Sequence, residues 1–192
     1  ALQIAKKQLP LQAKWILNPN REKHKNKHNM SKQISIDQAV EMIKDGMTVM
    51  IGGFLAVGSP NKIIEAMVKA GKKDLTVICN DTSYPEIGSG LLVASGCVKK
   101  VIASHIGTNP ITEQKMKEGT MEVELVPQGT LAERVRIGGA GIGGFLTATG
   151  VGTLAAEGKR TIEVDGKEYL LELPLRADVA LIGASVADKH GN

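Results

Sequence analysis

The chain has 192 residues, of which 42% are hydrophobic, 23% are charged and 22 are glycine. This length and composition predict one soluble globular domain with a buried core and exclude a disordered chain. The longest apolar run, residues 47–58, is well short of the roughly 20 residues that span a bilayer, so no membrane role is expected. Cys79 and Cys97 form no CxxC pair. We therefore expect reduced thiols in a cytoplasmic protein, with no metal site and no disulfide.

The positive charge lies almost entirely at the start of the chain, which as a whole has a net charge of +4. Residues 1–29 contain seven Lys or Arg and one acid, whereas residues 30–192 contain 17 basic and 19 acidic side chains. Nucleic-acid binding requires basic side chains gathered on a folded face, so this distribution excludes it.

The first 29 residues show no apolar periodicity, and Met30 precedes the first patterned segment. We expect residues 1–29 to be a non-native or disordered basic extension and residues 30–192 to form the domain. The rival interpretation is an organelle-targeting peptide, but such peptides are typically rich in Arg and Ser, and this segment is not.

From residue 31 onwards the predicted elements alternate between helix and strand. Helices are predicted where a capping box or an N-terminal proline precedes apolar residues at helical spacing. These segments are 35–46, 60–71, 110–119 and 130–137, with capping boxes at Ser35–Gln38 and Thr130–Glu133. Continuous apolar runs predict buried strands at 47–51, 75–79, 98–103, 123–126 and 178–182. This order predicts an α/β fold, an open and mainly parallel sheet with helices on both faces.

The pattern changes after residue 138, where a glycine-rich stretch begins. Two strand-like segments, 161–164 and 169–172, flank Asp165-Gly166, which is a strong signal for an inserted β-hairpin. The chain ends at Asn192 without a closing helix, so we expect a domain that is truncated at its C-terminus. Such a truncation is expected to expose the apolar segment Val179–Ile182.

Two glycine-rich segments are candidate binding loops. The first, residues 52–60, lies between a strand and a helix, where glycines allow a ligand to approach and helix amides favour an anion. Its spacing resembles a Walker loop, but the required Lys is absent, so a nucleotide triphosphatase is disfavoured; a plain tight turn is the simpler alternative. The second, residues 139–144, fits GxGxxG but follows a helix instead of a strand, which disfavours nicotinamide binding.

Polar side chains follow two other predicted strands, and the carboxyl ends of parallel strands are where ligands bind in such sheets. Gln128 lies between a strand and a helix, and its amide could donate to a developing oxyanion. Asn80 and Asp81 directly follow another strand. The alternative for all three is an ordinary turn residue that serves solvent or its own backbone. His105 and His190 have no partner pattern, so neither a hydrolase triad nor a metal site is indicated.

Taken together, the segments resemble the α (A) subunit of the family I coenzyme A transferases over residues 30–192. The similarity is greatest to the bacterial acetate/butyrate–acetoacetate transferases. The motifs that carry it are Asp45-Gly46, Val49–Phe54, Gly58, Pro60, Cys79–Thr82, Ala103–Gly107, Val126–Arg134, Gly138–Gly141, Thr149–Leu154 and Leu175–Ala180.

The resemblance implies a CoA-transferase/ribose-phosphate isomerase-like fold and transfer of coenzyme A between short-chain carboxylates such as acetate, butyrate and acetoacetate. A glutamate of a partner β subunit is implied as the nucleophile, in a Ser-Glu-Asn-Gly motif that this chain lacks. Gln128 is implied as the donor to the oxyanion. The implied substrate-binding residues are Gly52, Gly53, Phe54, Gly58, Asn80 and Asp81.

The resemblance further implies an α2β2 hetero-oligomer that uses acyl-CoA thioesters as substrates, with no cofactor and no metal. The alternative is a non-catalytic acyl-CoA or sugar-phosphate sensing domain on the same fold, because a fold alone does not dictate function. A sugar-phosphate isomerase or deaminase would need paired acid–base carboxylates beside a phosphate loop, and the sequence shows no such pairing.

Overall fold

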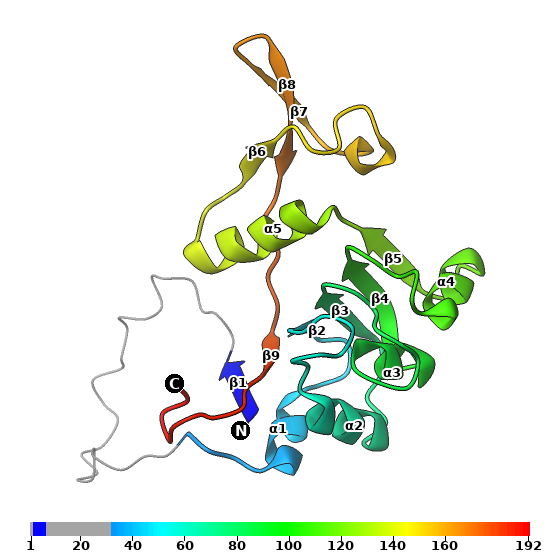
Figure 1. Cartoon of the computed structure of the whole chain (residues 1–192), viewed down its shortest axis with the longest axis vertical. Coiled ribbons are helices and arrows are strands. Elements are labelled where there is room, and N and C mark those ends of the chain that lie inside the picture. Colours follow the sequence, from blue (N-terminus) through cyan, green and yellow to red (C-terminus); the bar gives the residue numbers. More distant parts are fainter. Residues whose placement is uncertain (1, 7–31) are drawn as a thin grey trace.

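The computed structural model describes residues 2–6 and 32–192, which form a six-stranded sheet with flanking helices and a smaller three-stranded sheet (Figure 1). The helices are α1 (Ile36–Met42), α2 (Asn61–Lys69), α3 (Ser89–Ala94), α4 (Pro110–Lys117), α5 (Gln128–Ala140) and a 3-10 helix (Leu154–Ala156). The strands are β1 (Leu2–Lys6), β2 (Thr48–Ile51), β3 (Leu75–Cys79), β4 (Val98–Ala103), β5 (Glu122–Leu125), β6 (Phe145–Thr147), β7 (Thr161–Val164), β8 (Lys167–Glu172) and β9 (Val179–Gly183). None of the helices in these ranges combines the length and the apolar character needed to cross a bilayer.

The large sheet has the strand order β1-β9-β2-β3-β4-β5. Strands β9, β2, β3, β4 and β5 pair in parallel, and β1 pairs with β9 in the antiparallel direction. The predicted mainly parallel sheet is therefore confirmed. Because these strands are parallel, their carboxyl ends all lie at one edge of the sheet.

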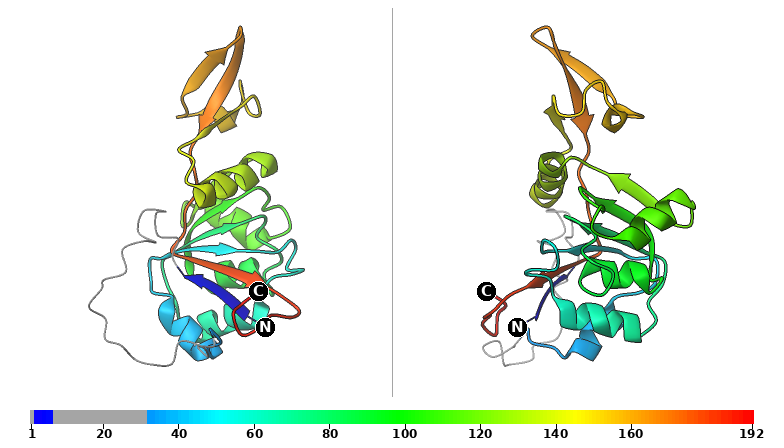
Figure 2. Two further views of the ribbon diagram at one scale, coloured as in Figure 1. Left: turned by 90° about the vertical axis from the view of Figure 1, so that its left-hand side faces the viewer. Right: turned by 45° about the vertical axis from the view of Figure 1, so that its right-hand side comes forward.

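One face of this sheet is covered by α1, α2, α3 and α4, which contact one another in chain order (Figure 2). The predicted apolar stripe of α2 supplies its centre, since Ile63, Ile64 and Met67 are completely buried. They pack with Val49 and Val77 of the sheet in the main core cluster. The capping box Ser35–Gln38 at the start of α1 is present as predicted.

The other face is covered by α5 and the chain segment that leads into β9. A smaller core cluster there joins Ile78 and Ile102 of the sheet to Leu131 of α5 and to Leu175. The prediction of helices on both faces holds, but the two layers are unequal.

The predicted start of α5 was wrong. The N-cap is Pro127, three residues before the predicted Thr130, and the Leu131 amide donates to the Pro127 carbonyl at 2.9 Å. Thr130 therefore lies inside the helix and is buried instead of capping it. Gln128 becomes the first residue of the helix as a result.

The smaller sheet, of order β6-β8-β7, projects away from the large sheet between α5 and β9 and is called the arm here (Figures 1 and 2). The predicted hairpin is confirmed in β7 and β8, and its turn residues Asp165 and Gly166 have φ angles of 52° and 73°. These positive values define the turn that matches the strand twist in two-residue hairpins. The third strand, β6, was not predicted.

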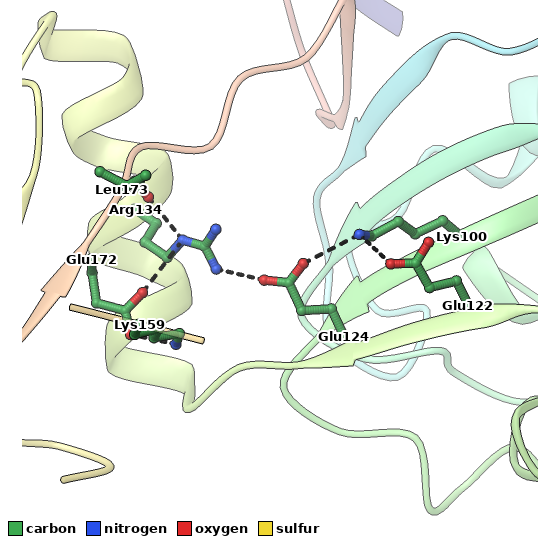
Figure 3. Close-up of polar contacts among 7 residues, drawn as sticks. All are labelled: Lys100, Glu122, Glu124, Arg134, Lys159, Glu172 and Leu173. Carbon is green, nitrogen blue, oxygen red and sulfur yellow. Dashed lines mark hydrogen bonds and ion pairs between the residues drawn. The ribbon is translucent and has the colours of Figure 1, made fainter. Parts of the chain in front are cut away.

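Arg134 of α5 ties the arm to the large sheet (Figure 3). Its guanidinium donates to Glu124 Oε1 of β5 and to the Leu173 carbonyl, both at 2.8 Å. It also lies 3.8 Å from Glu172, a buried carboxylate that binds Lys159 Nζ at 2.6 Å. Arg134 and Glu172 thus each have partners of opposite charge, as buried charged groups generally need.

The structure bears on two predictions about the ends of the chain, the exposed segment Val179–Ile182 and the extension 1–29. Of the segment expected to be exposed, Val179 and Leu181 are buried because they face the main core cluster, whereas Ile182, on the opposite face of the strand, is 50% exposed. Residues 2–6 of the predicted basic extension form strand β1, which was not predicted. The other residues of the extension, 1 and 7–29, lie outside the described residues, as does Met30.

Candidate active site

Four strand ends bring three predicted site residues, Gly53, Asn80 and Gln128, together with Ser104 at the carboxyl edge of the large sheet. The turn at Gly53 follows β2, Asn80 follows β3, Ser104 follows β4, and Gln128 lies just beyond β5 at the start of α5. Residues that are far apart in the sequence meet here because the strands are parallel and adjacent in the order β2-β3-β4-β5.

Hydrogen bonds join these four residues into one chain. Asn80 Nδ2 donates to the Gly53 carbonyl at 2.7 Å, and Gln128 Nε2 donates to Asn80 Oδ1 at 2.7 Å. The Ser104 hydroxyl lies 2.5 Å from Gln128 Oε1 and 2.8 Å from the Asn80 carbonyl. The Gln128 side chain is thus held at both ends of its carboxamide, although the residue itself is exposed.

The glycine turn after β2 is compact and requires glycine at Gly53. Its φ angle is +121°, and a Cβ there would lie 2.2 Å from Ser59 Oγ. Phe54 and Val57 close the turn with two backbone hydrogen bonds of 2.9 and 3.0 Å. Between them Leu55 and Ala56 have φ angles of 48° and 66°, values that glycine or asparagine usually adopts. This unusual backbone must be held from outside.

Asp81 supplies that support. Its side chain is 3% exposed, and its carboxylate accepts the Leu55 amide at 3.0 Å and the Ser83 amide at 2.7 Å. One carboxylate therefore joins the glycine turn to the loop that follows β3. Its oxygens point into the protein, so the geometry supports a holding role. Direct substrate binding by Asp81 stays a prediction.

Two apolar tips stand beside this site. Phe54 and Val57 form the first and are 59% and 78% exposed. Tyr84 and Ile87 form the second, in the loop after β3, and are 45% and 40% exposed. The two loops touch, since a Cβ on Gly88 would lie 3.0 Å from that of Ala56. Exposed apolar side chains gathered in this way are typical of an interaction surface.

The residues that directly follow the strands at this edge offer hydrogen-bond donors. Within three residues after the ends of β2, β3, β4, β5 and β9, the only acidic residue is Asp81, which is buried. Gln128 presents an amide, and the first backbone amides of α5 add partial positive charge beside it. The residues at this edge are therefore suited to stabilising a negative charge. Glu86, which is exposed, lies further along the loop after β3, between Tyr84 and Ile87.

The remaining candidate groups are placed elsewhere or are inert. Cys79 is buried, and this burial raises the pKa of its thiol to about 12, so it stays protonated. Both cysteines are free. Among residues 2–6 and 32–192, no cluster of three His, Cys, Asp or Glu side chains could hold a metal ion.

The structure brings together most of the predicted site residues. Hydrogen bonds join Gln128, Asn80 and Gly53. Phe54 is next to Gly53 in the same turn, and the Gly52 carbonyl accepts a bond from Ser59 at 3.0 Å. Gly58 lies at the far end of the turn, against Gly183 at the end of β9. Ser104 was missed. The same rule that selected Asn80, a polar residue directly after a buried strand, would have found it.

The fold places the chain among the open α/β proteins, which bind their ligands at the carboxyl ends of parallel strands. Residues 33–192 match the family model described as coenzyme A transferase, and the chain belongs to that family. The resemblance noted from the sequence is thereby confirmed.

Two bacterial relatives are more than half identical to the chain. The acetate CoA-transferase subunit alpha of Escherichia coli (strain K12) is 54% identical over 162 residues, which are 84% of this chain and 74% of the relative. The acetoacetyl-CoA:acetate/butyrate CoA transferase alpha subunit of Clostridium acetobutylicum is 55% identical over the same shares. A solved acyl-CoA transferase of Escherichia coli O157:H7 has the same fold, with a TM-score of 0.68 at 22% identity over 79% of this chain and 34% of that one.

Proposed function

We propose that this chain is the α subunit of an enzyme that exchanges coenzyme A between short-chain carboxylates such as acetate, butyrate and acetoacetate. The observation that carries the proposal is the Gln128 amide, which is held at both ends of its carboxamide at the carboxyl edge of the sheet. The substrates follow the names of the two bacterial relatives, which are also called alpha subunits. A non-catalytic sensing domain is not favoured.

The chemistry proposed for the complete enzyme uses a glutamate of the partner subunit. Its carboxylate attacks the thioester carbonyl of the acyl-CoA, and the C–S bond breaks to give a mixed anhydride and CoA thiolate. The thiolate then attacks the glutamyl carbonyl, which releases the first carboxylate and leaves a glutamyl-CoA thioester. The acceptor carboxylate reverses both steps. Two covalent exchanges thus replace one difficult direct exchange.

Gln128 has a definite part in this sequence. Each attack passes through a tetrahedral intermediate in which the carbonyl oxygen becomes negatively charged. An N–H held in place before the charge develops lowers the barrier, because it needs no reorganisation at that moment. The donor does not change its protonation state, so this contribution is expected to be independent of pH.

The apolar tips support the proposed partner. A nucleophile from another chain must come within bonding distance of a carbonyl held near Gln128, so the partner has to cover the surface around it. Phe54, Val57, Tyr84 and Ile87 are the exposed apolar side chains on the two loops that adjoin this point. Their burial by the partner would stabilise the complex, as apolar burial generally does.

The direct test is reconstitution. The chain and a partner that carries the Ser-Glu-Asn-Gly motif are purified separately, then assayed alone and mixed, with acetoacetyl-CoA as donor and acetate, butyrate and longer acids as acceptors. We expect exchange only in the mixture and only with short acids. Full exchange by this chain alone, or none by a stable complex, would overturn the proposal.

A further inference from the structure

We propose that Asn80 is a positioning residue for Gln128. Together with Ser104 it holds the Gln128 carboxamide in one orientation, with one N–H directed outward to meet the developing negative charge. This inference rests on the proposed function, because the charge on which Gln128 acts is part of that proposal. It assigns to Asn80 a role through Gln128 in place of direct substrate contact.

The orientation of both amides follows from one fixed point, the Gly53 carbonyl. A carbonyl oxygen only accepts hydrogen bonds, so the Asn80 atom 2.7 Å from it must be the NH₂ group. Asn80 therefore turns its oxygen towards Gln128. An oxygen there requires a donor, so the Gln128 NH₂ group faces Asn80 at 2.7 Å.

Ser104 holds the other end of the Gln128 carboxamide. With its NH₂ group towards Asn80, Gln128 presents its oxygen to the Ser104 hydroxyl, which can donate. Ser104 is itself anchored on Asn80, because its backbone amide donates to the Asn80 carbonyl at 3.0 Å. Neither amide of this chain can be rotated by 180° without setting two donors or two acceptors against each other, because the Gly53 carbonyl fixes Asn80 and Asn80 fixes Gln128.

Gln128 keeps one N–H for a ligand in this arrangement. A primary amide has two N–H groups, and among the described residues only Asn80 receives one of them. The residue is exposed, so the second N–H is available at the edge. An unsupported glutamine would present its oxygen as readily as its nitrogen, and an oxygen would repel the developing charge.

Asn80 also couples the donor to the glycine turn. Its NH₂ group holds the Gly53 carbonyl, and its oxygen holds Gln128, so both ends of its carboxamide are used by the protein. Its loss would free the Gln128 amide to rotate. Small losses of alignment at a reacting centre slow reactions by as much as about a hundredfold.

The test is a double-mutant cycle in the complex with the partner subunit, using N80A, S104A and S104T, each with Gln128 intact and with Q128A. We expect Q128A to lower kcat by ~10²–10³ and N80A to lower it by about tenfold to a hundredfold, with little change in KM. In the Q128A background N80A should lower kcat by less than about twofold, because its target is already gone. S104T keeps the hydroxyl and should restore most of the activity that S104A loses.

The control is S89A, which removes a buried hydrogen bond of 2.8 Å to the Asp81 carbonyl at the same edge. The Ser89 hydroxyl bonds to Asp81 and Ser83 and not to Gln128, so the effect of S89A on kcat should be equal in both backgrounds. An N80A effect that is equally large with and without Gln128 would refute the positioning role. If N80A does not assemble, S104A combined with Q128A gives the same test from the other end of the chain. A Q128A enzyme with normal kcat would instead refute the proposed function of Gln128.

Discussion

Asn80 and Asp81 follow the same strand but have different surroundings. Successive side chains of an extended chain point in opposite directions, and here one reaches Gln128 at the edge while the next is 3% exposed. The sequence placed both residues at the site because it shows which residues follow a strand. Whether Asn80 or Asp81 is exposed to solvent depends on which loops pack over them. Those loops come from distant parts of the sequence, so the residues around position 80 do not reveal them.

The structure predicts that Asp81 stabilises the glycine turn. D81A should lower the free energy of unfolding by about 2–3 kcal/mol, because it removes two charge-assisted bonds and leaves the Leu55 and Ser83 amides without an acceptor. The matched control is D45A, whose exposed carboxylate accepts the Lys73 amide at 2.9 Å and should matter by less than about 1 kcal/mol. Urea unfolding of the variants measures both. Equal effects would show that burial of Asp81 contributes nothing.

Helix α5 is the element that connects the site to the arm. It carries Gln128 in its first turn and Arg134 further along, and Gly138 lets the segment into β9 pass closely, since a Cβ there would lie 2.0 Å from the Leu175 carbonyl. Its attachment to the large sheet includes the Arg134–Glu124 pair (Figure 3). The position of Gln128 therefore depends on α5, which is held by the large sheet through Arg134 and by the segment into β9 that packs against Gly138.

The Arg134–Glu124 pair makes the stability of this attachment depend on pH. Burial alone would raise the pKa of Glu124, but the bond to Arg134 and the charges of Arg134 and Lys100 together hold it below its ordinary value of 4.5. A lowered pKa in the folded state stabilises the fold above that ordinary value, and the contribution is lost as the pH falls through the folded-state pKa.

E124Q should accordingly destabilise the protein by about 1–2 kcal/mol at neutral pH, and its difference from the wild type should shrink as the pH falls below 4.5. Denaturant unfolding at pH 7 and at pH 4 or below measures this. E133Q, which breaks a surface pair with Arg136, is the control and should have a much smaller effect. A deficit of E124Q that stays constant with pH would contradict the assignment.

At the scale of the whole molecule, the sequence predicted the elements with strong local signals. The strands 75–79 and 98–103 match β3 and β4 to the residue, and the Asp165-Gly166 hairpin is present. Helix α3 was missed because it has six residues and its N-cap, Gly88, makes no side-chain capping bond. The three residues of β6 form a strand only because β8 is there to pair with them.

The sequence predicted which residues lie at the candidate site better than it predicted what each of them does there. The rule that ligands bind at the carboxyl ends of parallel strands selects Gln128, Asn80 and Gly53 from the sequence alone, and hydrogen bonds join these residues in the folded chain. That Asn80 is bonded at both ends, and that Ser104 completes the chain, depends on distances between strands that are distant in sequence. Such contacts follow from the register of the sheet and not from any local pattern.

The central claim is that this chain positions a donor for a charge that another polypeptide's nucleophile creates. Peptide mass spectrometry of the reconstituted complex, incubated with acyl-CoA in the absence of an acceptor acid, tests it directly by locating the coenzyme A adduct. We predict the adduct on the glutamate of the partner's Ser-Glu-Asn-Gly peptide, with the peptides of this chain unmodified. An adduct on any carboxylate of this chain would contradict the account.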